Sequence, residues 1–458
     1  MEPASLGLAT LLLLGQIGPA RTTGGIGQPP GAVDPSTART DSSTQILTKV
    51  EEPDAVPAVR NVPQASIGGL AELRTGHPTS DVPTAQTEVE IDPFFAVRFP
   101  VGPGGVSLAY DPRIFIVGSY TPTSSVYYLH RGRLLLDTQA PRERYFVTVD
   151  GAYGKNDFLP LSTVLPPTSS GGLPPAQQPG TTPTTQPTPT PTPANGRLPD
   201  VRFVEVANLE ATAGLVYAVS PRVSWLASAG YLWSGGANAT AQQTLPLQKG
   251  PFGSTGPIWS LSPGDTLAAL LHGYHARFSN GPKSTGFDLT GTWTHQWSRS
   301  VQTDLIGGAA VFSSSLPGQP TTIDPYPVAG FAIHQSWIRK MGGWRNTLQV
   351  LIAPLPDRLT GAVYQRAAGI LASTWAVDER LSFLVTGSAA SGLDGNQRDA
   401  RVEGRVSYAV ARELSVSLGG RVAWLQGSTL LGPTGFGWTG LLTITTEVGS
   451  TNQAGNAN

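Results

Sequence analysis

The sequence predicts an all-β protein: a closed antiparallel transmembrane β-barrel of about eighteen strands, preceded by a disordered N-terminal segment. Apolar and polar residues alternate with period two along most of the chain, and the alternating segments are ten to twelve residues long. The connections between them alternate between tight turns and longer loops. The 54 glycines and 41 prolines among 458 residues exclude a helical bundle or coiled coil. Sixteen strands is the alternative count.

The N-terminal part is predicted to lie outside the barrel. Residues 1–20 resemble a secretory signal peptide, with an apolar core at 6–14 (LGLATLLLL) followed by small residues at Gly18 and Ala20. The segment 21–88 is rich in Gly, Pro, Thr, Ser and Ala without a sustained period, so we expect a disordered periplasmic segment. The barrel is then expected over 89–448, followed by a C-terminal tail at 449–458.

Strand length distinguishes a membrane barrel from a soluble sandwich. Residues 223–233 (VSWLASAGYLW) place Trp225, Tyr231 and Trp233 on one face, and residues 401–410 place their charges on one face. Strands of soluble sheets average about 5–6 residues, whereas a tilted membrane strand needs about 9–11. The segments have the greater length, which favours a bilayer.

The connections give the strand count. We expect tight periplasmic turns at residues 111–112, 140–143, 220–222, 262–265, 298–300, 340–344, 378–380 and 411–413. We expect longer extracellular connections at residues 100–105, 121–125, 155–199, 234–256, 279–283, 314–325, 354–359, 391–398 and 427–434. The two sets interleave and join eighteen strands. The strands at 89–99, 106–110 and 258–261 have the weakest patterns, and the loop 155–199 is rich in Pro and Thr.

Closure of the sheet is expected because an open edge would expose unpaired backbone amides to hydrocarbon. A ring of eighteen strands is wide enough to enclose a lumen, and its inward set is mostly Thr, Ser, Gly, Ala and Asn, with sparse charges of basic excess. The charged residues predicted to line the lumen are Arg131, Arg133, Arg144, Asp150, Glu210, Arg277, Asp288, Asp304, Arg401, Glu403, Arg405 and Arg421.

Aromatic residues toward the strand ends predict girdles at the two membrane interfaces, where amphipathic rings lie at headgroup level. The predicted interface aromatics are Trp225, Tyr231, Trp233, Trp293, Trp297, Trp337, Trp375 and Trp424. A sugar-stacking platform would instead need inward rings, for which Tyr127 and Phe146 are the candidates.

Enzyme, metal and cofactor chemistry are weakly represented. The chain has no Cys, and on a strand His272 and His275 fall on opposite faces, so we expect no metal and no cofactor. Residues 277–281 (RFSNG) differ from the His-x-Ser-Asn-Gly run of outer-membrane phospholipases because Arg277 cannot act as the base for Ser279. A polar turn is the favoured interpretation, and we expect no enzyme. A net charge of −1 gives no general attraction to nucleic acid.

Three short motifs carry a family resemblance: residues 108–116 (LAYDPRIFI), 129–131 (LHR) and 151–158 (GAYGKNDF). They resemble the porin-like outer-membrane barrels of myxobacterial type that accompany exopolysaccharide secretion. The resemblance implies an eighteen-stranded polymer conduit that replaces an outer-membrane segment missing from a periplasmic polysaccharide-export channel protein, which would be its partner.

The functional interpretation is therefore a passive conduit in the outer membrane of a Gram-negative bacterium, surrounded by outer-membrane lipid. Secreted polysaccharide is favoured as the contents of the lumen over small polar solutes. The alternatives are a general diffusion porin, a surface adhesin that uses the Pro/Thr-rich loop, and an outer-membrane lipid hydrolase centred on Ser279.

Overall fold

The computed structural model describes the chain from residue 64 to residue 449 with gaps. The described residues are 64–77, 86–101, 104–118, 125–157, 203–315, 320–339, 342–356, 363–378, 380–393, 398–411, 413–426 and 435–449. The expected signal peptide, the tail after 449 and nearly all of the Pro/Thr-rich loop lie outside these residues. No described helix has the length and apolar character needed to cross a membrane.

The described part is one sheet of nineteen strands with a single short helix. Its elements are β1 (Gln64–His77), β2 (Gln86–Val101), β3 (Gly104–Tyr110), β4 (Arg113–Gly118), β5 (Ser125–Gln139), β6 (Glu143–Asp157), β7 (Phe203–Ser220), β8 (Val223–Gly236), α3 (Ala239–Thr244), β9 (Gln248–Ser262), β10 (Asp265–Phe278), β11 (Lys283–Ser298), β12 (Val301–Ser315), β13 (Thr322–Arg339), β14 (Gly342–Pro356), β15 (Val363–Ala376), β16 (Leu381–Gly392), β17 (Arg398–Ala411), β18 (Leu414–Gln426) and β19 (Gly435–Gly449).

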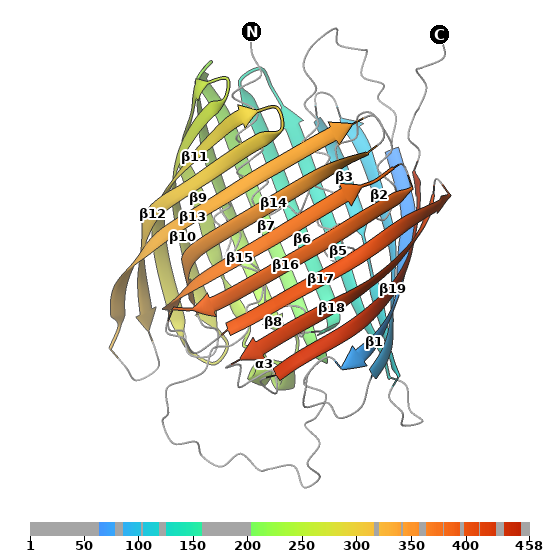
Figure 1. Ribbon diagram of the computed structural model, residues 1–458. Coiled ribbons are helices and arrows are strands. Elements are labelled where there is room, and N and C mark those ends of the chain that lie inside the picture. The colour runs from blue at the N-terminus through green and yellow to red at the C-terminus, as the bar shows by residue number, and fades with distance from the viewer. Residues whose placement is uncertain are drawn as a thin grey trace.

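The sheet closes on itself as an antiparallel barrel. Apart from β3 and β4, each strand pairs with its sequence neighbours, and β1 pairs with β19 from Ser66 opposite Gly449 to His77 opposite Trp438. The short strands β3 and β4 share one position between β2 and β5, so the barrel has eighteen strand positions. Figure 1 shows the strands running obliquely around the barrel, with α3 at one end. The predicted closed barrel and its count are confirmed.

The predicted tight turn at residues 111–112 is wrong. Both β3 and β4 pair antiparallel with β2 in one continuous register, which places Pro93 opposite Pro112. Proline has no backbone N–H to donate, so the ladder is interrupted there while the chain continues in the same direction. Asp111 still pairs with the neighbouring strand, because its amide donates to the carbonyl of Arg131 on β5 (3.0 Å). The prolines interrupt one strand and do not reverse it.

The predicted boundary of the disordered segment at residue 88 is also wrong, because β1 lies within residues 21–88 and the barrel begins at Gln64. Glycines at 68, 69 and 76 dilute the alternation of β1, which explains why the sequence pattern is weak. The prediction omits β1 and counts β3 and β4 as two strand positions, so the two errors cancel in the strand count. The connection between β2 and β3 consequently lies at the short-turn end, where β1 begins and β19 ends, and not among the longer loops.

The strand expected at 258–261 is much longer than predicted. β9 spans Gln248–Ser262, and the connection before it contracts to residues 237–247 with α3. Its glycines and prolines conceal the strand pattern but serve close approach: a Cβ on Gly250, whose φ is +159°, would lie 1.7 Å from the carbonyl oxygen of His275. A side chain there would separate β9 from β10.

The two faces of the sheet differ as a membrane barrel requires. Apart from β3 and β4, the strands run from 12 residues in β16 to 18 in β7, longer than the sequence pattern indicated. Side chains crowd together on the concave side of a barrel and splay apart on the convex side, so the covered residues of each strand face inward. The exposed set is apolar or aromatic at most positions, including Phe287, Leu289 and Leu418. This face meets lipid.

Candidate functional site: the inner face of the barrel

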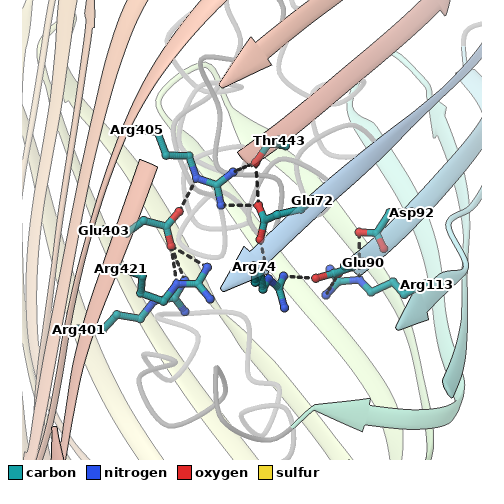
Figure 2. A network of polar contacts seen from close by, with 10 residues as sticks. All are labelled: Glu72, Arg74, Glu90, Asp92, Arg113, Arg401, Glu403, Arg405, Arg421 and Thr443. Carbon is teal, nitrogen blue, oxygen red and sulfur yellow. Dashed lines mark hydrogen bonds and ion pairs between the residues drawn. The ribbon is translucent and has the colours of Figure 1, made fainter. Parts of the chain in front are cut away.

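A cluster of nine charged side chains and one threonine covers the inner face around the junction of the first and last strands. We call it the charged wall. Figure 2 shows its side chains reaching toward one another from β1, β2, β4, β17, β18 and β19. Its members are Glu72, Arg74, Glu90, Asp92, Arg113, Arg401, Glu403, Arg405, Arg421 and Thr443.

Glu403 of β17 binds three guanidinium groups and is fully buried. Arg401 Nη2 donates to Glu403 Oε2 at 2.7 Å, and Arg405 Nε donates to Glu403 Oε1 at 2.5 Å. From the neighbouring strand β18, Arg421 Nε donates to Oε2 at 2.7 Å. Residues 401, 403 and 405 alternate along one strand and therefore share its inward face, while the register places Arg421 directly opposite Glu403.

Glu72 of β1 connects this cluster to the other side of the closing junction. Arg405 Nη2 lies 2.9 Å from Glu72 Oε2, and the hydroxyl of Thr443 on β19 donates to the same oxygen at 3.0 Å. Arg405 Nη1 in turn donates to the Thr443 hydroxyl at 3.0 Å. These contacts join β17 to β1 across the two intervening strands β18 and β19 (Figure 2).

The cluster continues onto β2 and β4. Arg74 Nε donates to Glu72 Oε1 at 2.6 Å, and its Nη2 is hydrogen-bonded to Glu90. Arg113 Nη1 lies 3.5 Å from Glu90 Oε1, and Arg113 Nε lies 3.7 Å from Asp92 Oδ2. Five arginines thus interleave with four carboxylates. A buried charge is tolerated only when it is paired, and this arrangement leaves a net charge of only +1 on the charged wall.

Other inward charges form smaller groups on the adjoining strands. Arg144 Nε donates to Asp137 Oδ1 at 3.0 Å, and Arg131 Nη1 lies 3.5 Å from Asp111 Oδ2. Arg133 pairs with Asp150.

Asp150 also lies opposite Glu210 of β7 in the register, so this part of the inner face is acidic. Farther round the barrel, Asp304 accepts from the Thr294 hydroxyl at 2.7 Å and lies 3.3 Å from His334 Nε2.

The structure places all but one of the predicted lining residues on the inward face. Arg277 is the exception: it is exposed on β10 between the buried residues Ala276 and Phe278 and faces outward, so that prediction is wrong. Ala268, Leu270, Ala276 and Phe278 are the covered residues of β10, so alternation along this strand places Arg277 on the outward face. That the inward residues contact a passing molecule stays a prediction. The inward-facing predicted residues are Arg131, Arg133, Arg144, Asp150, Glu210, Asp288, Asp304, Arg401, Glu403, Arg405 and Arg421.

The sequence prediction missed six of the ten members of the charged wall, including Thr443. Glu72 and Arg74 lie on β1, within the segment expected to be disordered, and Glu90 and Asp92 lie on β2, whose pattern is weak. Arg113 begins β4, directly after the predicted turn at 111–112. A signal was present: in residues 70–74 (LAELR), Leu70, Glu72 and Arg74 alternate with Ala71 and Leu73. Two charges on one face opposite apolar residues are typical of a barrel strand.

An apolar wall covers the inner face of β6–β10. We define it by the buried residues Phe146, Val216, Leu226, Ile258 and Leu270, which pack together. The Phe146 ring lies directly over Gly214 of the next strand, where a Cβ would come within 2.2 Å of the ring. Phe252 covers Gly230 in the same way, at 2.5 Å. Glycine on the neighbouring strand lets these rings lie flat along the wall.

The two inward rings considered for sugar contact are packed against protein. Tyr127 stacks on Phe203 with 4.3 Å between ring centroids, and the Lys155 ammonium lies 4.7 Å from the centre of the Tyr127 ring. Phe146 belongs to the apolar wall. Both side chains are less than a tenth exposed, so sugar contact at these rings stays a prediction and would require them to be uncovered.

The eight predicted interface aromatics are all exposed on the outward face. Three of their indole N–H groups find acceptors on neighbouring strands: Trp225 donates to Thr255 Oγ1 (2.9 Å), Trp293 to Asp265 Oδ1 (3.2 Å) and Trp297 to Thr303 Oγ1 (3.0 Å). Trp344 and Trp438, which were not predicted, are exposed as well. Contact with lipid headgroups stays a prediction. Toward the short turns lie Trp225, Trp293, Trp297, Trp337 and Trp375, and toward the loop end lie Tyr231, Trp233 and Trp424.

The polar loop tip after β10 is occupied by structural hydrogen bonds. The amide of Leu247 donates to Ser279 Oγ at 3.0 Å, and the Ser279 amide donates to the Leu247 carbonyl at 2.8 Å. His275 faces outward while His272 is buried on the inward face. His275 Nδ1 contacts the hydroxyl of Thr285 (2.8 Å). The Ser279 hydroxyl thus holds the neighbouring loop.

Comparison with known proteins identifies the family. The EpsX exopolysaccharide export family matches residues 71–449. No curated protein matches the chain. Among solved structures, OccK1 (OpdK) of Pseudomonas aeruginosa is 10% identical with a TM-score of 0.43 over 84% of this chain and 98% of that chain.

OpdO of Pseudomonas aeruginosa is 12% identical with a TM-score of 0.43 over 85% of this chain and 97% of its own. OccAB4 of Acinetobacter baumannii is 9% identical with a TM-score of 0.41 over 86% of this chain and 100% of its own. From the family match and the closed barrel with its apolar outward face, we conclude that the chain belongs to the EpsX exopolysaccharide export family and is an outer-membrane β-barrel.

Proposed function

We propose that this barrel is a passive conduit through which a secreted polysaccharide crosses the outer membrane. The observation that carries the proposal is the internal pairing of the inward charges. In the charged wall, five arginines are matched by four carboxylates, and Glu403 alone accepts from three of them. Ions that are already paired and hydrogen-bonded to one another attract a passing solute far less than unpaired ions would.

Hydroxyl groups are among the other polar side chains that face inward, and several pair with one another. Ser417 Oγ donates to Ser407 Oγ at 2.8 Å, and Ser228 and Ser254 lie 2.7 Å apart through their hydroxyl oxygens. A hydroxyl both donates and accepts, so it can exchange its hydrogen bonds with the hydroxyls of a sugar at little net change in free energy. Such a lining suits a long, weakly charged polymer that must bind and release many times during transit.

The apolar wall is compatible with passage because its rings lie against the strands. Phe146 and Phe252 each cover a glycine of the neighbouring strand. The circumference of eighteen strands exceeds that of the eight-stranded barrels whose interiors are filled by side chains. We further propose a periplasmic polysaccharide-export channel protein as partner, docked at the end where the short turns lie.

Deletion of the gene in the producing bacterium tests the proposal. We expect polysaccharide to disappear from the cell surface and polymer to accumulate inside the envelope, with uptake of small polar solutes unchanged. Loss of solute uptake with normal polysaccharide secretion would instead identify a general diffusion porin. Removing residues 168–195 tests the adhesin alternative, which requires surface binding to fall while secretion persists. Unchanged lipid hydrolysis in Ser279→Ala eliminates the hydrolase.

Purified barrel in liposomes tests the weak electrostatics of the lining. We expect a neutral oligosaccharide and its sulfated form of equal length to leave the vesicles at rates within about threefold of one another, because paired charges impose little selectivity. The matched variant Glu403→Gln leaves three guanidinium groups without their shared carboxylate. We expect it to slow the sulfated form selectively. A strong preference for one charge in the unaltered protein would contradict the proposal.

A further inference from the structure

Three cations lie side by side on the outward face near the loop end of the barrel. Lys249 of β9 pairs with Arg277 of β10, and Arg277 pairs with Lys283 of β11. On the other side, Trp233 of β8 lies opposite Lys249. All four side chains are exposed. Neighbouring strands lie about 4.8 Å apart, so the three cations span only about 10 Å. We call Lys249, Arg277 and Lys283 the cationic row.

The neighbouring strands supply no carboxylate to this row. The acidic residues on β8–β12 are Asp265, Asp288 and Asp304. Asp288 and Asp304 belong to the inward set of their strands, and Asp265 lies at the short-turn end of β10, about 40 Å along the strand from Arg277. On β7, Glu205 bonds the Tyr153 hydroxyl and the Asn238 amide.

Among the described residues, the Arg277 guanidinium contacts another basic side chain and no carboxylate. Its Nε donates to His275 Nε2 at 3.2 Å, and that histidine lies on the same outward face. In the charged wall, by contrast, every arginine has a carboxylate neighbour within 3.7 Å. Adjacent like charges on a sheet repel one another. The outward face of these strands therefore provides no carboxylate to pair with the cationic row.

The surface below the row is apolar. Tyr231, Leu271, Phe287 and Leu289 are exposed on the same outward faces, toward the middle of the barrel. Lysine and arginine side chains are long enough to bury their stems in an apolar environment while their charged ends reach the headgroup level. The exposed ring of Trp233 has the same amphipathic preference. Charge and apolar surface are thus stacked in the order of a lipid headgroup and its acyl chains.

We propose that the cationic row binds the phosphorylated headgroup of a lipid in the outer leaflet, whose acyl chains lie along Tyr231, Phe287 and Leu289. The loop end of an outer-membrane barrel faces the outside, which places the row in the outer leaflet. A headgroup with two phosphates matches a row of three cations better than a zwitterionic one. The site is independent of what passes through the lumen.

Native mass spectrometry of the full-length barrel in detergent, with bisphosphorylated lipid A and its dephosphorylated form at equal concentration, tests the site. We expect the unaltered protein to retain one bisphosphorylated lipid in preference. Each of Lys249→Gln, Arg277→Gln and Lys283→Gln should weaken that binding about fivefold, and the triple variant roughly a hundredfold. Arg277→Lys should bind within about twofold of the unaltered protein.

The matched control is Arg398→Gln, which removes an exposed arginine at the loop end of β17 and should leave lipid binding unchanged. Heat-modifiable migration on electrophoresis verifies that each variant is folded. Equal retention of the two lipids by the unaltered protein would overturn the proposal, as would full retention by the triple variant. Displacement of the lipid by equimolar glucosamine phosphate would also overturn it, because the site would then recognise a soluble phosphate and not a lipid.

Discussion

The charged wall and the apolar wall stabilise the same barrel by different physical means. In the charged wall, hydrogen-bonded ion pairs connect residues far apart in the sequence, as between Thr443 and Glu72, which are 371 residues apart. In the apolar wall, Phe146, Leu226 and Leu270 come from consecutive hairpins and pack by contact alone. Ion pairs and hydrogen bonds require particular partners and directions, whereas apolar packing needs only shape and volume.

This difference follows the topology. Consecutive hairpins find their partners through short connections, so their pairing needs little further specification. The junction of β1 with β19 closes the longest loop in the protein, and a register slip of one residue there would turn the inward side chains outward. We infer that the directional contacts of Glu72, Arg405 and Thr443 select the closing register.

The largest effect should come from removing the carboxylate at the centre of the charged wall. Glu403→Gln leaves Arg401, Arg405 and Arg421 close together without their common counter-charge, and breaking a buried pair in this way costs about 3–5 kcal/mol. Urea unfolding of the barrel in detergent or liposomes measures it. Glu413→Gln, in the exposed turn before β18, is the control. Equal unfolding midpoints for the two variants would show that the wall adds no stability.

Substitutions in the apolar wall should lower the free energy of unfolding by less, because apolar packing does not depend on one particular partner. Leu270→Ala removes a fully buried side chain and leaves a cavity, at a cost of about 2–4 kcal/mol. Its neighbour Leu271 faces outward, where lipid fills the space of a shortened side chain, so Leu271→Ala should change the unfolding midpoint less. The same unfolding assay compares the two. A larger effect at Leu271 would indicate that the inward and outward assignments of β10 are reversed.

A smaller effect is expected for the hydroxyl that links the two sides of the closing junction. Thr443→Val keeps the shape of the side chain but removes the hydrogen bonds to Glu72 and Arg405, which should lower the free energy of unfolding by about 1–2 kcal/mol. Thr445→Val, two residues along the same strand, is the matched control. If register selection depends on this hydroxyl, refolding yield should fall in Thr443→Val but not in the control.

The smallest effect lies in a turn outside both walls. Asp378 Oδ1 accepts from the amides of Arg380 and Leu381, each at 2.7 Å, and these bonds hold the pKa of Asp378 below its ordinary value. A depressed pKa stabilises the turn above the ordinary carboxyl pKa, and this stabilisation disappears as the pH falls through the folded value. We expect hydrogen exchange of the Leu381 amide to accelerate, after correction for the intrinsic rate, over that acidic range. Asp378→Ala should exchange faster at neutral pH and lose the pH dependence.

Much of the barrel could be predicted because the period-two alternation of a strand involves only residues that are close in the sequence. The faces of β8, β17 and β18 agree with the alternation in the sequence, and the eight predicted aromatics are exposed on the outward face. The prediction failed where glycine and proline dilute the pattern, at β1, at β9 and at Pro112. The glycines of β1 and β9 allow the backbone of a neighbouring strand to approach closely. Pro112 lies opposite Pro93, and both prolines interrupt the hydrogen-bond ladder at the same point. Neither role is visible without the neighbour.

The candidate site divides in the same way. Arg401, Glu403, Arg405 and Arg421 were predicted on the inward face because their strands alternate clearly. Their neutralisation by Glu72 and the participation of Thr443 were not predicted. The sequence predicts sparse lining charges of basic excess, and in the structure Glu72, Glu90 and Asp92 bring the charged wall to a net charge of only +1.

The sequence by itself determined that the chain forms long amphipathic strands, that they span a membrane as a closed barrel, and which face most of them turn to lipid. It did so because successive side chains of a strand point to opposite sides, a property of the local backbone. Only the tertiary structure decided that β1 seals the barrel against β19, which charges neutralise one another, and that Lys249, Arg277 and Lys283 form a row. Those facts depend on register between strands, and register is set by contacts between residues that the sequence leaves far apart.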